Sequence, residues 1–146
     1  MRWTPRKNCA KYLKLITPLI MTPQLARMFN LGFAQKSLEV LYDYGVFTTM
    51  FPALADVEDT EALKAYEQEV AEELDRLYAE GEKILNKTFL SRILLPAVEE
   101  AEKTMTPEEA VLYTLGRQAV VFRFAGGILR ETIEMMLNLT EEPDAA

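Results

Sequence analysis

Residues 34–52 read AQKSLEVLYDYGVFTTMFP, and this stretch holds both a buried helical stripe and the signal that ends it. Leu38, Leu41 and Tyr42 recur at the i, i+3, i+4 spacing of one helix face, which predicts a helix. Gly45 suits the left-handed position that follows the last turn of a helix. The remaining residues predict one further helical turn, which a proline closes. We expect the stretch to pack against other helices and to perform no chemistry itself.

Similar start and stop signals recur along the chain and predict an all-α fold. Thr106 and Glu109 have the spacing of a capping box, with Pro107 at the first helical position. No segment alternates polar and apolar residues as a half-buried strand would. We therefore expect one domain over residues 1–146, an irregular bundle of about seven or eight short helices, with a frayed tail over 140–146. Six expected helices cover about residues 5–17, 23–30, 34–44, 46–51, 60–85 and 128–139. A further helix is capped by Thr88 and kinks or restarts at Pro96. Another, of about four turns, starts at Pro107.

Charge is unevenly distributed over the 146 residues, whose formal net charge is −7. Residues 1–50 carry seven Lys or Arg against two acids, whereas residues 51–115 carry six against sixteen. The overall acidity argues against a chain that binds nucleic acid by charge alone. Two interpretations remain open. The charges simply face solvent, or the N-terminal third and the late arginines build a basic face on an otherwise acidic domain.

Several chemistries are excluded by composition. The chain has no histidine, so it lacks the commonest general base and metal ligand. Its single cysteine, Cys9, excludes an intramolecular disulfide and a structural zinc site, and fits a reducing cytoplasm. No glycine-rich phosphate loop is present, and no apolar run approaches the roughly 20 residues that span a bilayer. We expect no catalytic residue, no metal site, no cofactor on this chain and no membrane partner.

Arginines near the C-terminus are the best candidates for binding. Arg117, Arg123 and Arg130 lie six and seven residues apart, and aromatic residues interleave with them. Guanidinium groups beside exposed rings can hold single-stranded RNA through phosphate contacts and base stacking. The alternative is that the rings belong to the core and the arginines pair with neighbouring glutamates. The rings are Tyr113, Phe122 and Phe124, and the glutamates are Glu131 and Glu134.

Several short motifs follow one another along the chain. They are Gly32-Phe33-Ala34, Leu41, Tyr44-Gly45-Val46-Phe47 and Phe51-Pro52, then Leu74-Asp75-Arg76, Gly81, Phe89-Leu90 and Leu94-Leu95-Pro96-Ala97-Val98, and finally Arg123-Phe124 and Leu129-Arg130-Glu131. Their order resembles the bacterial poly(A) polymerase family, which belongs to the class II nucleotidyltransferases together with the CCA-adding tRNA nucleotidyltransferases. The resemblance covers about residues 27 to 139 and lies in the helical region that follows the catalytic head of that family.

The resemblance implies an RNA-binding helical body that holds single-stranded or tRNA-like 3′ ends for polyadenylation or related nucleotide addition. The Gly-Ser turn and the Asp-x-Asp pair of the head do not occur in this sequence. Mg²⁺ and ATP would then belong to a separate catalytic head, and this chain would not be catalytic by itself. The alternative is a helical protein-interaction module that keeps the fold without binding RNA. The candidate phosphate ligands are Arg27, Lys36, Arg117, Arg123 and Arg130.

Overall fold

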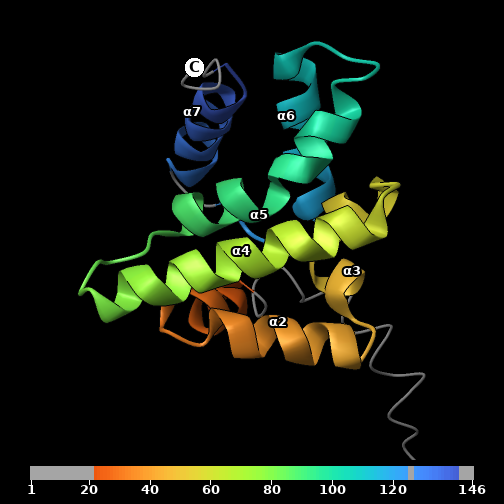
Figure 1. The fold of residues 1–146 in the computed structure, drawn as a ribbon. Coiled ribbons are helices and arrows are strands. Elements are labelled where there is room, and N and C mark those ends of the chain that lie inside the picture. Colours follow the sequence, from red (N-terminus) through yellow and green to blue (C-terminus); the bar gives the residue numbers. More distant parts are fainter. Residues whose placement is uncertain (1–21, 125–126, 142–146) are drawn as a thin grey trace, which may run out of the picture.

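The computed structural model describes residues 22–124 and 127–141, and Figure 1 shows their helices joined by short connections. No strand occurs within these two ranges, so the predicted all-α fold is confirmed. The predicted helix over residues 5–17 and Cys9 lie outside them. Residues 140–141, expected in the frayed tail, continue the last helix. The helices cover residues 22–30, α2 Ala34–Asp43, α3 Phe47–Met50, the 3₁₀ helix η1 Pro52–Asp56, α4 Thr60–Ala79, α5 Asn86–Ala101, α6 Pro107–Gln118 and α7 Ile128–Glu141.

Helix α5 occupies the centre of the bundle. It packs against η1, α4, α6 and α7, whereas α2 packs against α4 and α3. Figure 1 shows α4 crossing the bundle with α2 below it, while α6 and α7 stand on the other side of α5. Seven residues of α5 are buried, which explains why its apolar residues run nearly all round the helix instead of forming one stripe.

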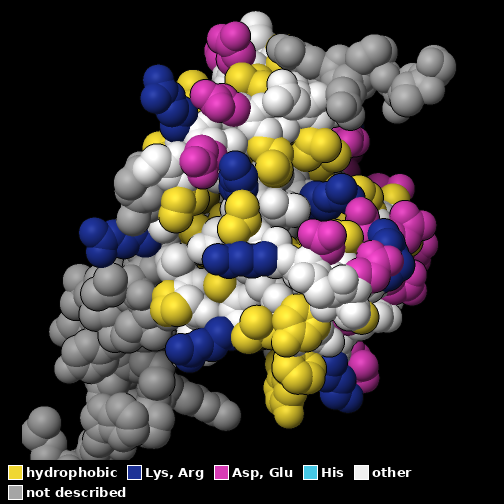
Figure 2. Space-filling model, turned by 90° about the vertical axis from the view of Figure 1, so that its left-hand side faces the viewer, with side chains coloured by type: hydrophobic (Ala, Val, Ile, Leu, Met, Phe, Trp, Pro, Cys, Tyr) yellow, Lys and Arg dark blue, Asp and Glu magenta, His cyan; other side chains and the backbone are white. Residues whose placement is uncertain are grey.

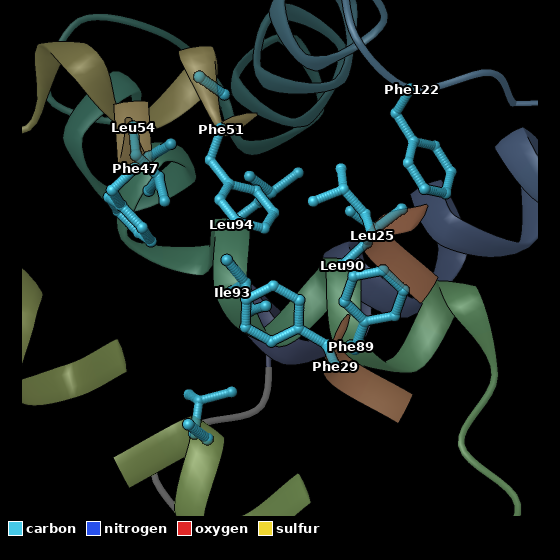
Figure 3. Packing of buried hydrophobic residues seen from close by; sticks show 14 of the residues in the cluster. Leu25, Phe29, Phe47, Phe51, Leu54, Phe89, Leu90, Ile93, Leu94 and Phe122 are labelled. Carbon is cyan, nitrogen blue, oxygen red and sulfur yellow. The ribbon is translucent and has the colours of Figure 1, made fainter. Parts of the chain in front are cut away.

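Aromatic rings connect the parts of the core (Figure 3). The ring of Phe29 lies 5.6 Å from that of Phe51 in an edge-on contact and 5.9 Å from that of Phe89 in a stacked contact. The Phe47 ring touches that of Phe51, and the Phe122 ring meets that of Phe89 edge-on. Phe47 and Phe51, from the stretch quoted first above, therefore anchor α3 and the start of η1 in the common core.

Two helices end at a glycine, and the first of them was predicted. After α2, Gly45 has a φ of +66°, its N–H donates to the Tyr42 carbonyl, and the Val46 N–H donates to the Leu41 carbonyl. Gly81 repeats this arrangement after α4, with a φ of +86°. Both are the paired hydrogen bonds that close a helix on a left-handed residue. The predicted helix over 60–85 is therefore too long, because Gly81 ends α4 and residues 80–85 form a connection.

The predicted start of the next helix is also wrong. Helix α5 begins at Asn86, its N-cap position is Leu85, and no side chain caps it, so Thr88 lies inside the first turn. The helix continues through Pro96 without restarting. Proline removes one hydrogen bond inside a helix, but the buried residues on either side of it keep the two halves packed in the core.

Helix α6 starts as predicted and ends early. The Thr106 side chain accepts the Glu109 N–H, and the Glu109 carboxylate accepts the Thr106 N–H, which confirms the capping box. The helix ends at Gln118, so it is shorter than the four turns expected. Val120 lies on the surface, whereas Val121 and Phe122 turn back into the core. An apolar run near the end of a helix indicates that its residues are buried, but it does not indicate that they are helical.

Candidate nucleic-acid interface

The five predicted phosphate ligands occupy different parts of the bundle. Arg27 is exposed on the helix over 22–30, and Lys36 is exposed in the first turn of α2. Arg123 is exposed in the connection that follows α6. Arg130 is exposed at the start of α7, whereas Arg117 is half-buried in the last turn of α6.

Ion pairing separates these side chains into two groups. Arg117 pairs with Asp56 of η1 and lies 5.9 Å from the centre of the Tyr113 ring. Arg130 lies 3.9 Å from a carboxylate oxygen of Glu134, as the alternative interpretation of the sequence expects. The other three have no ion pair with another residue of the described ranges, and only two further Lys side chains there share this property. These unpaired cations are Arg27, Lys36, Lys64, Lys83 and Arg123.

Three polar contacts connect the elements that carry several of these cations. The Arg123 N–H donates to Oγ1 of Thr22 over 2.7 Å, which fixes the post-α6 connection against the helix that carries Arg27. At the other end of that helix, Asn30 donates to Asn86 at the start of α5 over 3.3 Å. The start of α5 is in turn connected to the start of α7 by an ion pair of 3.8 Å between Lys87 and Glu131.

Lys83 and Lys87 are members of this group that sequence reasoning missed. Both line a depression of about 310 Å³ together with Ile128 and Glu131, next to Arg130 in the chain. The predicted helix over 60–85 included Lys83, whereas α4 ends before it and leaves Lys83 in a connection. We name Arg27, Lys83, Lys87, Arg123 and Arg130 the basic cluster.

Figure 2 shows the face that carries the connection between α4 and α5. Lys and Arg side chains spread over its middle among hydrophobic ones, while Asp and Glu side chains gather toward one side of the view. Acidic residues crowd the exposed side of α4, where Glu61, Glu69 and Glu72 lie. The charged residues are therefore distributed unevenly over the surface as well as along the sequence.

The aromatic residues between the late arginines are mostly not available for stacking. Phe122 is fully buried, and the half-buried Phe124 packs on it with ring centres 5.1 Å apart. Tyr113 is exposed, but it lies beside Arg117 on α6, and Arg117 is already paired. Of the two interpretations of residues 113–130, the burial of Phe122 favours the one in which the rings belong to the core.

The most perturbed acid–base groups lie in the core and not in the basic cluster. Burial raises the pKa of the Glu67 carboxyl well above its usual range. Burial, and to a smaller extent the charge of Glu67, raises the pKa of Tyr42 to about 12. In the described ranges no group of three or more His, Cys, Asp or Glu side chains is arranged to hold a metal ion. The cluster offers positive charge and hydrogen-bond donors, which suit binding of an anion.

Among the described helices, none combines the length and the apolar character needed to cross a membrane. Comparisons of the chain with protein-family models, with curated proteins and with solved structures found no match.

Proposed function

We propose that this chain is the RNA-binding helical body of a poly(A)-polymerase-like nucleotidyltransferase. In this proposal it holds a single-stranded RNA 3′ end while a separate catalytic head, which would bind Mg²⁺ and ATP, adds nucleotides. The ordered motif resemblance over residues 27 to 139 supports the family. The all-α fold is compatible with it but is shared by many unrelated proteins.

The observation that carries the proposal is the position of the unpaired cations. Arg27, Lys83 and Arg123 have no ion pair among the described residues, and two hydrogen bonds and an ion pair connect the helix over 22–30 to the segment after α6 and, through the start of α5, to α7. A cation without a carboxylate neighbour keeps its full charge for a phosphate, and binding does not first require an ion pair to break. Lys87 and Arg130 add charge nearby at the cost of weak, exposed pairs.

The acidic remainder of the surface favours a defined orientation for the ligand. The exposed carboxylates of α4 repel a polyanion, so we expect RNA to avoid that side of the bundle. Binding is therefore expected to be weak, local and strongly dependent on salt.

Fluorescence anisotropy with a labelled oligoadenylate of about 12 nucleotides, within the usual size of single-strand sites, tests the proposal at low salt. We expect the triple variant Arg27→Gln, Lys83→Gln, Arg123→Gln to bind about tenfold more weakly or worse, because three phosphate contacts are lost. Lys64→Gln is the matched control. Lys64 is also an unpaired cation, but it belongs to α4 and lies over the Tyr42 ring of α2. Equal loss in the control, or no loss in the triple variant, would contradict the proposal.

A protein-interaction module is the second candidate, and the acidic side of α4 favours it. Exposed carboxylates there suit a basic protein partner. The same titration separates the two candidates, because absence of RNA binding at low salt would favour the protein partner.

A further inference from the structure

Three large hydrophobic side chains lie exposed around the turn between the helix over 22–30 and α2. Leu31, Phe33 and Tyr78 are 44 %, 63 % and 45 % exposed. They belong together because a Cβ placed on Gly32 would lie 2.7 Å from Cδ1 of Tyr78. The Tyr78 ring, at the end of α4, therefore covers Gly32. Leu31 and Phe33 are the chain neighbours of Gly32. We name these three residues the aromatic patch.

The turn that carries the patch is fixed to α4 by hydrogen bonds. The Asp75 carboxylate, one turn before Tyr78, accepts the N–H groups of Ala34 over 2.7 Å and of Gln35 over 3.1 Å. Gly32 adopts a φ of +89°, a conformation that few other residues adopt without strain. The backbone that carries the patch is thus fixed and does not have to be ordered when a ligand binds.

Unpaired cations flank the patch on several sides. Arg27 lies in the last turn of the helix over 22–30, four residues before Leu31, and Lys36 lies in the first turn of α2, three residues after Phe33. Lys83 follows Tyr78 after the sharp turn at Gly81. Glu80 lies two residues after Tyr78. Arg76 pairs with Glu80 over 3.2 Å and compensates its negative charge.

We propose that the aromatic patch is a stacking platform for the bases of single-stranded RNA, whose phosphates contact Arg27, Lys36 and Lys83. This inference rests on the proposed function and assigns it a mode of recognition. Exposed rings beside cations are what single-strand binding requires, because each base has a face to stack and each linkage a charge to neutralise. Phe33 is too exposed to line an apolar groove, and three unpaired cations are no advantage to an apolar peptide.

Stacking would explain two features that the phosphate contacts alone do not. Large apolar side chains that lie exposed side by side, unlike a single exposed one, are typical of a binding surface. Lys36 lies apart from the basic cluster. The start of α2, which carries Lys36, is joined to the end of the helix over 22–30 by a 2.9 Å hydrogen bond from Ser37 to the Met28 carbonyl. Lys36 can therefore contact the same RNA strand.

The test compares two labelled probes of equal length on the full chain, an oligoadenylate and an abasic oligonucleotide with the same phosphates and no bases. We expect the oligoadenylate to bind more tightly, and Phe33→Ala or Tyr78→Ala to weaken it about 5- to 150-fold while leaving the abasic probe nearly unchanged. Tyr78→Phe should retain binding, because the ring remains.

Tyr44→Ala is the matched control. Tyr44 is 78 % exposed and follows the opposite end of α2, about 15 Å along the helix from Phe33. Its loss should change neither probe. Circular dichroism melts of all variants check that they fold, and Phe33→Leu, which keeps an apolar side chain without a ring, replaces Phe33→Ala if that variant unfolds.

Two results would overturn the inference. If both probes bind equally, and Phe33→Ala does not alter their salt-dependent binding, the proposed function stands and the platform is wrong. If instead Phe33→Ala abolishes a concentration-dependent self-association seen by sedimentation without affecting the oligoadenylate, the patch is a contact between copies of the chain. Failure of the wild-type chain to bind either probe would remove the proposed function together with this inference.

Discussion

Glu67 lies in the middle of α4 with 2 % of its surface exposed, and neither carboxyl oxygen has a hydrogen-bond partner in the described part of the chain. The buried hydroxyl of Tyr42, on the facing helix α2, also lacks one. Burial disfavours the charged carboxylate, so the folded protein holds the Glu67 proton more tightly than the unfolded chain does.

The sign of the resulting pH dependence follows from the raised pKa. At pH values below the unfolded pKa, about 4.3, both states are protonated and Glu67 has no effect. As pH rises above that value, only the unfolded state loses the proton, so stability falls by at most about 1.4 kcal/mol per pH unit until the folded group ionises.

We predict that Glu67→Gln removes this decline. Urea unfolding between about pH 4 and pH 8, the interval above the unfolded pKa, should show the variant gaining on the wild type as pH rises. Glu69→Gln, an exposed change on the same helix, is the control and should leave the pH profile unaltered. Parallel profiles for the wild type and Glu67→Gln would contradict the assignment.

Gly32 and Gly45 allow a second comparison of single residues. Both have positive φ, +89° and +66°, but a Cβ at Gly32 meets the Tyr78 ring while one at Gly45 meets nothing within 4 Å. We predict that Gly45→Ala costs about 1–2 kcal/mol from backbone strain, and that Gly32→Ala costs more. Thermal melts measure both. Equal costs would mean that Tyr78 moves aside without penalty.

At the scale of helices, the start of α2 depends on a residue from another helix. Phe33 occupies its N-cap position and provides no side-chain hydrogen bond. Asp75 of α4 replaces the missing cap, since its carboxylate accepts two backbone N–H groups and the Gln35 side-chain amide. A negative charge at this position also interacts favourably with the helix dipole.

We predict that Asp75→Ala destabilises the protein by about 1–2 kcal/mol and increases hydrogen exchange at the Ala34 and Gln35 amides. Asp75→Asn should cost less, because its carbonyl oxygen can still accept one of these bonds. Asp43→Ala at the other end of α2 is the control and should be neutral or slightly stabilising, since an acid is unfavourable there. Unchanged exchange at the two amides in Asp75→Ala would contradict this capping role.

How well each helix could be predicted depended on whether its ends are set locally. Thr106, Glu109 and Gly45 act within one turn of the chain, so the sequence predicts their helix ends correctly. Helix α5 starts at Asn86 without a side-chain cap, and only its packing defines that start. Asp75 caps a helix some 40 residues before it in the chain, and no local pattern indicates such a contact.

For the whole molecule, the all-α class could be predicted and the surface could only partly be predicted. Arg27, Arg123 and Arg130 were candidates from the sequence, and the fold brings the elements that carry them together. Arg117 lies apart and is bound to Asp56, a partner 61 positions earlier that spacing does not reveal. Lys83 and Lys87 were missed because their position depends on where α4 ends.

This distribution of charge suggests why an acidic chain could still bind RNA. Net charge sums the whole surface, whereas a short single strand responds to the potential within roughly 10 Å at ordinary salt. On the face shown in Figure 2, Lys and Arg side chains spread over the middle, whereas Asp and Glu side chains gather toward one side.

The salt dependence of RNA affinity tests the central claim most directly. The logarithm of the association constant for oligoadenylate, plotted against the logarithm of salt concentration, should fall with a slope of about −2 or steeper for the wild type. The triple variant of Arg27, Lys83 and Arg123 should lose about 2 units of that slope, since each single-strand phosphate contact contributes about 0.7. An unchanged slope in the variant, or no binding by the wild type at low salt, would contradict the account.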